Sequence, residues 1–140
     1  MAFVLDASVT IPWAFATPHP YAAHVLELLA EEEALVPSIW PLEVANGILG
    51  GERRGQLDVA HSARFLNLLR ALDITVDMTG AERILSVVLE LARTQHLSSY
   101  DAAYLELAMQ EGIPLATMDD DLRAAAGRVG VLLVDDLQAG

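Results

Sequence analysis

Short apolar runs alternate along this sequence with longer stretches in which apolar residues recur every three or four positions. The runs are typical of buried strands, and the recurring positions are typical of helices that turn one face toward a core. On this basis the sequence predicts five short strands, at residues 2–5, 34–36, 74–76, 114–117 and 131–134.

Prolines and glycines indicate where several of the predicted helices begin and end. Pro18 and Pro20 bracket the start of the first helix, and Pro41 suits the first turn of the second. Gly112 follows the helix that begins at Ser98 and is a usual stop signal. Four of the predicted helices span residues 21–33, 59–72, 81–93 and 98–111. Another begins at residue 41 and ends near the glycines at 50–51 or at 55. Residues 119–121 lead into a last, short helix that runs through residue 126.

Strands separated by helices predict an α/β layer fold with a largely parallel sheet. The chain has 140 residues, the usual size of one compact domain, so we expect residues 1–140 to form a single domain. In open sheets of this kind, ligands bind beyond the carboxyl ends of the strands, near the point where strand order reverses. Asp6 and Asp119 both follow predicted strands and therefore occupy that position.

Composition excludes some classes of catalytic site and bears on which partners the chain can bind. Without cysteine, the chain has no thiolate nucleophile or sulfur metal ligand, and we expect a reducing, cytoplasmic setting with no membrane span. Hydrophobic residues make up 54% before glycine is counted, above the roughly 45–50% of an average domain with glycine counted, which favours a dimer or a partner complex. The net charge is −12 with no lysine, which by itself argues against binding a polyanion.

Four acids are candidates for a site, although each has an ordinary structural explanation. Asp6 suits a turn after a strand or a helix N-cap, and Glu43 is favoured in the first turn of a helix by the helix dipole. Asp101 stands three residues after Ser98, the spacing of a capping box, and Asp119 suits the N-cap of a short helix. All four lie at helix N-terminal or strand C-terminal ends, so they can converge.

Converging carboxylates require a counter-charge. Two of them about 4 Å apart repel by roughly 4 kcal/mol at an effective dielectric constant of 20. Mg²⁺ or Mn²⁺ resolves this repulsion because both ions prefer hard oxygen ligands. Such a site can activate water for phosphodiester cleavage with one or two metal ions.

Other polar residues near these acids have weaker claims. Ser8, Asn46 and Thr117 could orient the carboxylates or bond the attacking water, although a bond to the local backbone is the ordinary role of such residues. Arg53 and Arg54 could contact phosphate, and the preference of basic residues for a helix C-terminus explains them equally well. The histidines show no close metal-binding spacing, and we interpret them as ordinary surface or core residues: His19, His24, His61 and His96.

Taken together, four segments resemble the motifs of PIN-domain ribonucleases, specifically VapC-like toxins, over nearly the whole chain and in the expected order. They are Val4-Leu5-Asp6-Ala7-Ser8, Pro41-Leu42-Glu43-Val44-Ala45-Asn46, Ser99-Tyr100-Asp101-Ala102-Ala103-Tyr104-Leu105 and Ala116-Thr117-Met118-Asp119-Asp120-Asp121-Leu122. No single motif is specific, but the joint match is.

The resemblance implies a three-layer α/β/α PIN-like fold with a central, mainly parallel sheet and a Mg²⁺- or Mn²⁺-dependent endoribonuclease activity. It also implies a homodimer and a cognate antitoxin that blocks the site and confers DNA binding on the complex, so we expect no DNA binding by this chain alone. The family's acidic quartet falls on Asp6, Glu43, Asp101 and Asp119, and its accessory polar positions fall on Ser8, Asn46 and Thr117. Asp120 or Asp121 could share the role of Asp119, although the Thr-x-Asp pattern favours Asp119.

Two other readings compete with a nuclease. A receiver domain or a haloacid-dehalogenase-like phosphatase also places an aspartate after its first strand, but both normally require a lysine near the phosphoryl group, and this chain has none. A degenerate PIN-like domain could instead serve as a binding or scaffold module, with its acids as remnants. The presence of all four acids argues against this second reading.

Overall fold

A parallel sheet forms the centre of the molecule. The computed structural model describes residues 1–16 and 19–135, and its four strands lie in the order β3-β2-β1-β4. All three strand pairs are parallel, as predicted. The strands are β1 (Ala2–Leu5), β2 (Glu33–Pro37), β3 (Ile74–Asp77) and β4 (Leu115–Ala116).

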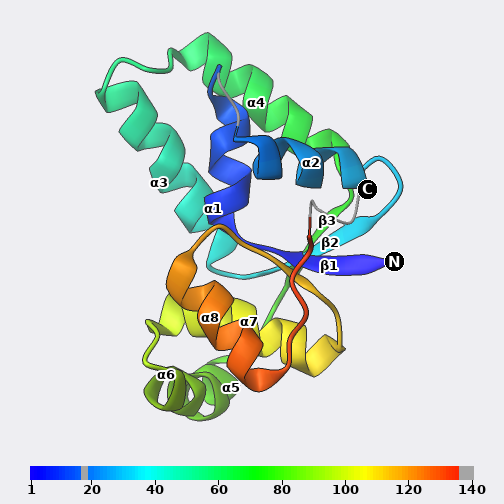
Figure 1. The fold of residues 1–140 in the computed structure, drawn as a ribbon. Helices are drawn as coiled ribbons and strands as arrows, with labels where there is room; N and C mark the ends of the chain where they lie inside the picture. Colours follow the sequence, from blue (N-terminus) through cyan, green and yellow to red (C-terminus); the bar gives the residue numbers. More distant parts are fainter. Residues whose placement is uncertain (17–18, 136–140) are drawn as a thin grey trace.

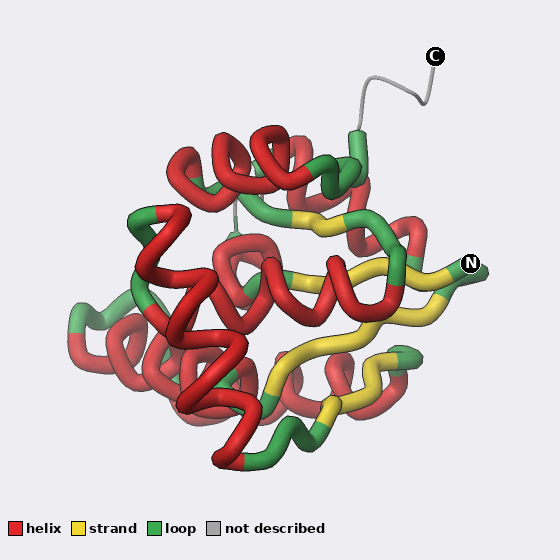
Figure 2. Tube along the Cα trace, turned by 90° about the horizontal axis from the view of Figure 1, so that it is seen from below, coloured by secondary structure: helices red, strands yellow, loops and turns green. Residues whose placement is uncertain are grey.

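Helices cover both faces of this sheet and give a three-layer α/β/α arrangement (Figures 1 and 2). Above the sheet in Figure 1 lie α1 (Ala7–Thr10), the 3-10 helix η1 (Ile11–Ala14), α2 (Pro20–Leu28), α3 (Trp40–Arg53) and α4 (Val59–Ala71). Below it lie α5 (Ala81–Arg83), the π-helix η2 (Ile84–Val88), α6 (Leu89–Gln95), α7 (Ser99–Glu111) and α8 (Asp120–Val129).

Local signals explain where many of these helices start and stop. Side-chain acceptors on Asp58, Ser98 and Asp119 each bond a backbone amide in the first helical turn, which replaces a bond that the helix itself cannot supply. Gly112 and Gly130 end α7 and α8 with φ values of 65° and 80°, a left-handed conformation that glycine adopts without strain. The helix ends predicted from glycine and from capping residues follow from this chemistry.

Several predicted elements differ in detail from the observed ones. Of the two expectations for Asp6, a turn or a helix N-cap, the second holds for the backbone: Asp6 precedes α1 as its N-cap residue, and its carbonyl accepts bonds from the amides of Val9 and Thr10. The predicted helix 21–33 ends at Leu28, after which backbone amides bond the carbonyl three residues earlier. The last helix, α8, continues past residue 126 to Val129. Inside the predicted helix 81–93, residues 84–88 are π-helical.

The predicted fifth strand at 131–134 is reduced to an isolated parallel bridge between Leu115 and Leu133. The Leu115 amide donates to the Leu132 carbonyl, and the Leu115 carbonyl accepts from the Val134 amide, both at 2.9 Å. The segment therefore runs beside β4, but β4 is only two residues long and offers no longer ladder. Pro18 and the tail after Asp135 lie outside the described residues.

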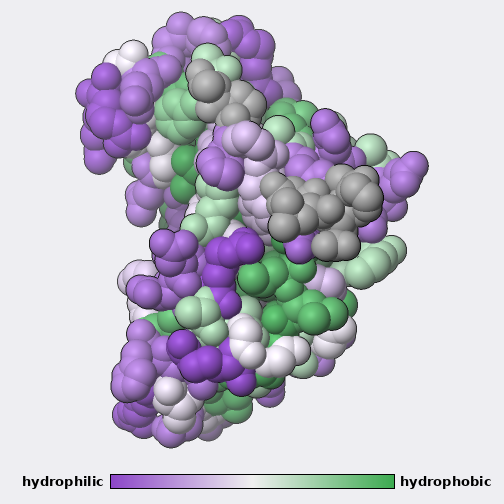
Figure 3. Space-filling view, in the orientation of Figure 1, coloured by the Kyte–Doolittle hydropathy of each residue, from purple (hydrophilic) through white to green (hydrophobic). Residues whose placement is uncertain are grey.

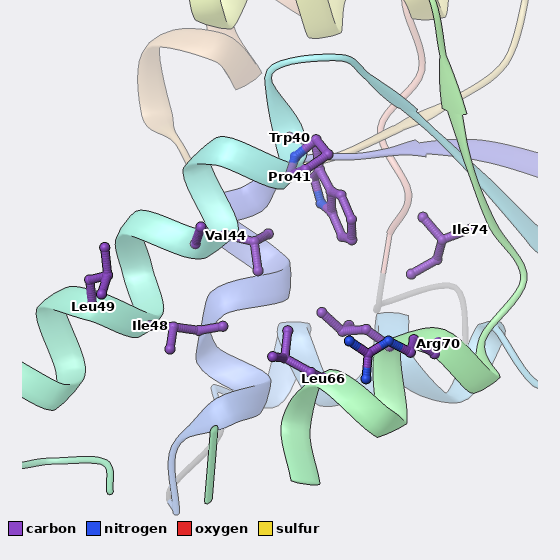
Figure 4. A pocket seen from close by; sticks show the side chains of 10 residues that line it. Trp40, Pro41, Val44, Ile48, Leu49, Leu66, Arg70 and Ile74 are labelled. Atoms are coloured by element: carbon purple, nitrogen blue, oxygen red, sulfur yellow. The ribbon is translucent and has the colours of Figure 1, made fainter. Parts of the chain in front are cut away.

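Mainly apolar side chains line a groove between α3 and α4. The groove has a volume of about 480 Å³, and Val44 and Ile48 of α3 face Leu66 of α4 across it, with Arg70 at its side (Figure 4). Figure 3 also shows apolar patches breaking up a mainly hydrophilic face. Among the described residues, no helix is long and apolar enough to cross a membrane.

The layer below the sheet contains an ion pair that links α5 to α7, with an exposed Arg83 and a buried Glu106. Arg83 donates from Nε to Oε1 of Glu106, whose side chain is only 6% exposed. The other carboxylate oxygen, Oε2, is buried with no hydrogen-bond partner among the described residues. Arg83 therefore supplies the one salt bridge that the described residues give to this buried charge.

Replacing Arg83 with Met should lower the free energy of unfolding by about 1–3 kcal/mol, because it leaves the buried Glu106 carboxylate unpaired. The matched control is Arg93→Met, which removes an exposed pair with Glu90 and should cost less than about 1 kcal/mol. Urea unfolding measures both. Equal losses in the two variants would contradict this interpretation.

Candidate functional site

Strand order reverses between β1 and β4, and this is where the predicted site residues gather. The chain proceeds from β1 through β2 to β3 on one side, while β4 joins β1 on its other side. The Asp6 amide donates to the Ala116 carbonyl at 3.0 Å, which fixes the ends of the two strands against each other. The strands' carboxyl ends open toward the hollow between the upper and lower helices at the left of Figure 3.

The Asp6 carboxylate is held by hydroxyl groups rather than by capping bonds to the helix that follows it. Asp6 is 4% exposed, and its carboxylate makes no capping bond to α1. Both Ser8 Oγ and Thr117 Oγ1 donate to Asp6 Oδ2 at 2.7 Å. Burial raises the pKa of Asp6, the Thr117 and Ser8 bonds partly offset this effect, and the charge of Asp119 raises the pKa further. The carboxylate is thus fixed in position and sensitive to nearby negative charge.

Ser8 and Thr117 are themselves oriented by the chain. Ser8 Oγ accepts a bond from the Met118 amide at 3.0 Å, and Thr117 Oγ1 accepts one from the Asp119 amide at 3.1 Å. With their acceptor sites occupied in this way, both hydroxyl protons are directed toward Asp6. Thr117 is fully buried, so its position is set by packing as well as by these bonds.

Glu43 lies in the first turn of α3, and Tyr104 of α7 donates to its Oε1 at 2.5 Å. Burial and this hydrogen bond raise the pKa of the Tyr104 hydroxyl, so it remains a donor. Burial also raises the pKa of Glu43, with the Tyr104 bond opposing the effect and the Asp6 charge adding to it. Sequence reasoning missed Tyr104 as a site residue. Its only signal is its place one turn after Asp101 on the same helix face.

Asp101 is the acid most affected by the other three. The Asp101 amide donates to Ser98 Oγ at 3.1 Å. In a full capping box the carboxylate would in turn accept a bond from the Ser98 amide, and no such bond is present among the described residues. Burial, followed by the charges of Asp119, Asp6, Glu43 and Asp121, raises its pKa to about 6. All four predicted acids therefore lie within electrostatic reach of one another.

Asp119 combines a structural role with a place in the cluster. Its Oδ1 accepts the Leu122 amide at 2.9 Å and caps α8. Its charge also raises the pKa of both Asp6 and Asp101, whereas Asp121 affects only Asp101 and ranks last among the causes there. Of the three consecutive aspartates, Asp119 is thus the one most closely coupled to the other acids.

Asn46 is not brought into bonding contact with the acids. It is exposed on α3, and its side chain makes no hydrogen bond to another described residue. Arg53 and Arg54 are exposed at the far end of the same helix, where Arg54 bonds to Gln56. The structure therefore gathers Ser8 and Thr117 around Asp6 but leaves these other three polar residues apart from the acids.

The donor set suits a divalent metal ion, although the arrangement is not that of a closed site. Among residues 1–16 and 19–135, no three carboxylate or imidazole side chains already stand in position to hold an ion together. No described residue donates to the Asp101 carboxylate or to the second oxygens of Glu43 and Asp119, so hard oxygen ligands remain available. Mutual repulsion of the acids supplies the electrostatic demand for a cation.

Comparison with known proteins places this geometry in a family. The family model of the PIN domain, a domain that is in general a nuclease, matches residues 3–128. A comparison with curated proteins found no match.

Solved structures share the fold. PAE2754 from Pyrobaculum aerophilum has a TM-score of 0.74 and 23% identity, covering 99% of this chain and 93% of that one. A toxin-antitoxin complex from Klebsiella pneumoniae has a TM-score of 0.64 and 19% identity, covering 93% and 95%. VapBC2 from Rickettsia felis, bound to a DNA fragment from their promoter, has a TM-score of 0.63 and 16% identity, covering 96% and 98%. The expected PIN-like fold is thereby confirmed.

The raised pKa of Asp101 predicts how the stability of the metal-free protein depends on pH. Because its folded pKa of about 6 lies above the ordinary value of 3.8, its stabilising contribution is present below the ordinary value and is lost as pH rises through about 6. In EDTA at neutral pH, Asp101→Asn should therefore unfold at a higher urea concentration than the unsubstituted chain, and the difference should shrink near pH 5. Asp73→Asn, which changes an exposed acid, should show no such pattern. A loss of stability in Asp101→Asn at neutral pH would refute the repulsive cluster.

Proposed function

The chain belongs to the PIN-domain family, and from that premise we propose that it is a divalent-metal-dependent endoribonuclease that hydrolyses RNA phosphodiester bonds. The observation that carries the proposal is the gathering of Asp6, Glu43, Asp101 and Asp119 at the strand switch point, with mutual effects on their pKa values. A site made of carboxylates and hydroxyls suits hydrolysis that uses water rather than a protein nucleophile.

We assign Asp6, Glu43, Asp101 and Asp119 as the residues that would hold Mg²⁺ or Mn²⁺. When bound, such an ion supplies Lewis-acid activation of water and neutralises charge on the scissile phosphate. The protein's own part is preorganisation: Ser8 and Thr117 fix Asp6, and Tyr104 fixes Glu43, so these ligands lose little freedom on binding. Water adds to phosphorus and the bond to the 3′ oxygen breaks, with a proton passing to that oxygen.

The biological setting we propose is that of a VapC-like toxin, with a cognate antitoxin protein as partner and a homodimer as its assembly. Support comes from structures of the same fold, which include the Klebsiella toxin-antitoxin complex and Rickettsia VapBC2. The apolar groove between α3 and α4 supports a protein partner in general (Figure 4). An RNA substrate places the protein in the cytoplasm, and DNA binding is assigned to the complex with the antitoxin rather than to this chain alone.

Metal binding can be tested without any substrate. At 100 times its dissociation constant, an ion that binds only the folded state stabilises it by about 2.7 kcal/mol, which corresponds to roughly 10 °C in melting temperature for a chain of this size. Mn²⁺ should produce such a shift in the unsubstituted chain and in Asp73→Asn, and a much smaller one in Asp6→Asn. An equal response in Asp6→Asn would remove that residue from the site.

Catalysis is tested with purified, antitoxin-free protein and a mixed RNA pool. Cleavage should require Mn²⁺ or Mg²⁺, disappear in EDTA, and disappear in Asp101→Asn, because that substitution removes a charged ligand while nearly preserving its shape. Clear Mn²⁺ binding without cleavage indicates a narrow substrate absent from the pool. The absence of both cleavage and metal binding would instead support the alternative, a degenerate PIN-like scaffold module.

The ends of the products test the chemistry separately. Attack by water with departure of the 3′ oxygen leaves a 5′-phosphate and a 3′-hydroxyl. Fragments from the RNA pool should therefore be ligatable at their 3′ ends without enzymatic repair. A 2′,3′-cyclic phosphate would show that the neighbouring 2′-hydroxyl is the nucleophile and would refute this mechanism.

A further inference from the structure

The chain must hold a polyanion with very little positive charge. It has a net charge of −12, and its eight basic residues are all arginines. Three of the arginines below the sheet already bond other side chains: Arg83 pairs with Glu106, Arg93 pairs with Glu90, and Arg128 donates to Gln95. An RNA-binding group has to be an arginine whose charge is still available and that lies near the acids.

Arg123 meets both conditions. It lies one turn after Asp119 on α8, and its NH1 donates to the Thr117 carbonyl at 2.8 Å. Its guanidinium carbon lies 5.4 Å from the centre of the Tyr21 ring, within the range of a cation–π contact. None of the salt bridges within residues 1–16 and 19–135 involves Arg123. Its position is therefore fixed by neutral groups, which leave its charge intact.

A pocket of about 260 Å³ opens at this arginine, lined by His19, Tyr21, Met118, Asp120 and Arg123. Nδ1 of His19 accepts a bond from the Tyr21 amide at 3.1 Å, which places the proton of the neutral ring on Nε2. The pocket thus contains two kinds of N–H donor, guanidinium and imidazole. The Asp120 carboxylate opposes an anion there, but it is exposed and can turn into solvent.

We propose that this pocket binds a phosphate of the RNA backbone next to the scissile linkage, with Arg123 as the principal donor and His19 as the second. The inference rests on the proposed nuclease function, because it takes RNA as the ligand. Arginine suits this role because its planar group offers paired donors to phosphate oxygens after one N–H is committed to Thr117. The competing explanation is that Arg123 only ties α8 to α2 and to the end of β4.

Binding is measured by fluorescence anisotropy with a labelled, mixed-sequence, single-stranded RNA in Mg²⁺, in the Asp101→Asn background so that the RNA stays intact. Arg123→Gln should weaken binding about tenfold and reduce the slope of log affinity against log salt by about 0.7, the value for one phosphate contact in single strands. Arg123→Lys should restore most of the salt dependence. Arg128→Gln, which removes the same charge from an exposed position on the same helix, is the matched control and should change binding by less than about twofold.

His19→Asn is a second variant that does not depend on the folding of the arginine variant. Asparagine can still accept a bond from the Tyr21 amide, but its shorter side chain lacks the more distant Nε2–H donor of the imidazole. This variant should weaken binding as well, with an unchanged melting temperature. If Arg123→Gln and His19→Asn both bind RNA as tightly as Arg128→Gln does, the pocket is structural and the inference is overturned.

A kinetic comparison separates this inference from the proposed function. Bis(p-nitrophenyl) phosphate carries a single phosphate, so the loss that Arg123→Gln causes on this substrate should be several-fold smaller than the loss on the RNA pool, for which its KM should rise about tenfold. An equal loss on both substrates would place Arg123 at the scissile phosphate and overturn the neighbouring subsite. If the unsubstituted chain with Mn²⁺ cleaves neither substrate, the nuclease proposal fails, and the anisotropy measurement still decides whether Arg123 binds RNA.

Discussion

Repulsion among carboxylates at the carboxyl edge of a parallel sheet is the constraint on which the rest of this structure depends. Asp6, Glu43, Asp101 and Asp119 come from four segments of the chain, and each of the first three has its pKa raised by burial and by at least one other acid. A fold that only needed stability would separate these groups or pair them with cations. Here they are kept together and steadied by hydroxyl donors, which bond the charges without neutralising them.

The elements around the acids fix the positions of the three hydroxyl donors, which belong to Ser8, Thr117 and Tyr104. Ser8 is the second residue of α1, which starts just after β1, and Thr117 is fully buried directly after β4, so both reach the same oxygen of Asp6. Tyr104 reaches Glu43 because α7 packs across the sheet opposite α3. Each donor stands on a helix or strand end fixed by the core, which is how a protein maintains a geometry that its own charges oppose.

Sequence reasoning succeeded where a signal is local. Apolar runs located the four paired strands, capping residues and glycines located helix ends, and the order of the acids suggested the site. It failed where contacts join distant segments: Tyr104 bonds a residue 61 positions away, and its place one turn after Asp101 does not distinguish it from other residues on that helix face. The π-helical turn at residues 84–88 likewise has no signal in the apolar periodicity of the sequence.

An acidic nuclease needs carboxylates to bind metal ions and positive charge to bind RNA, and Thr117 contacts a group of each kind. Its hydroxyl donates to the Asp6 carboxylate, and its carbonyl accepts the Arg123 guanidinium, so one buried residue sets the place of both a metal-ligating acid and an available cation. A polyanion that approaches a chain of net charge −12 is repelled at long range, and a bound metal ion and short-range donors near the acids would counter that repulsion. If the proposed function holds, affinity in this protein is concentrated at the site itself, and a few fixed groups do what a broad basic surface does in other RNA-binding proteins.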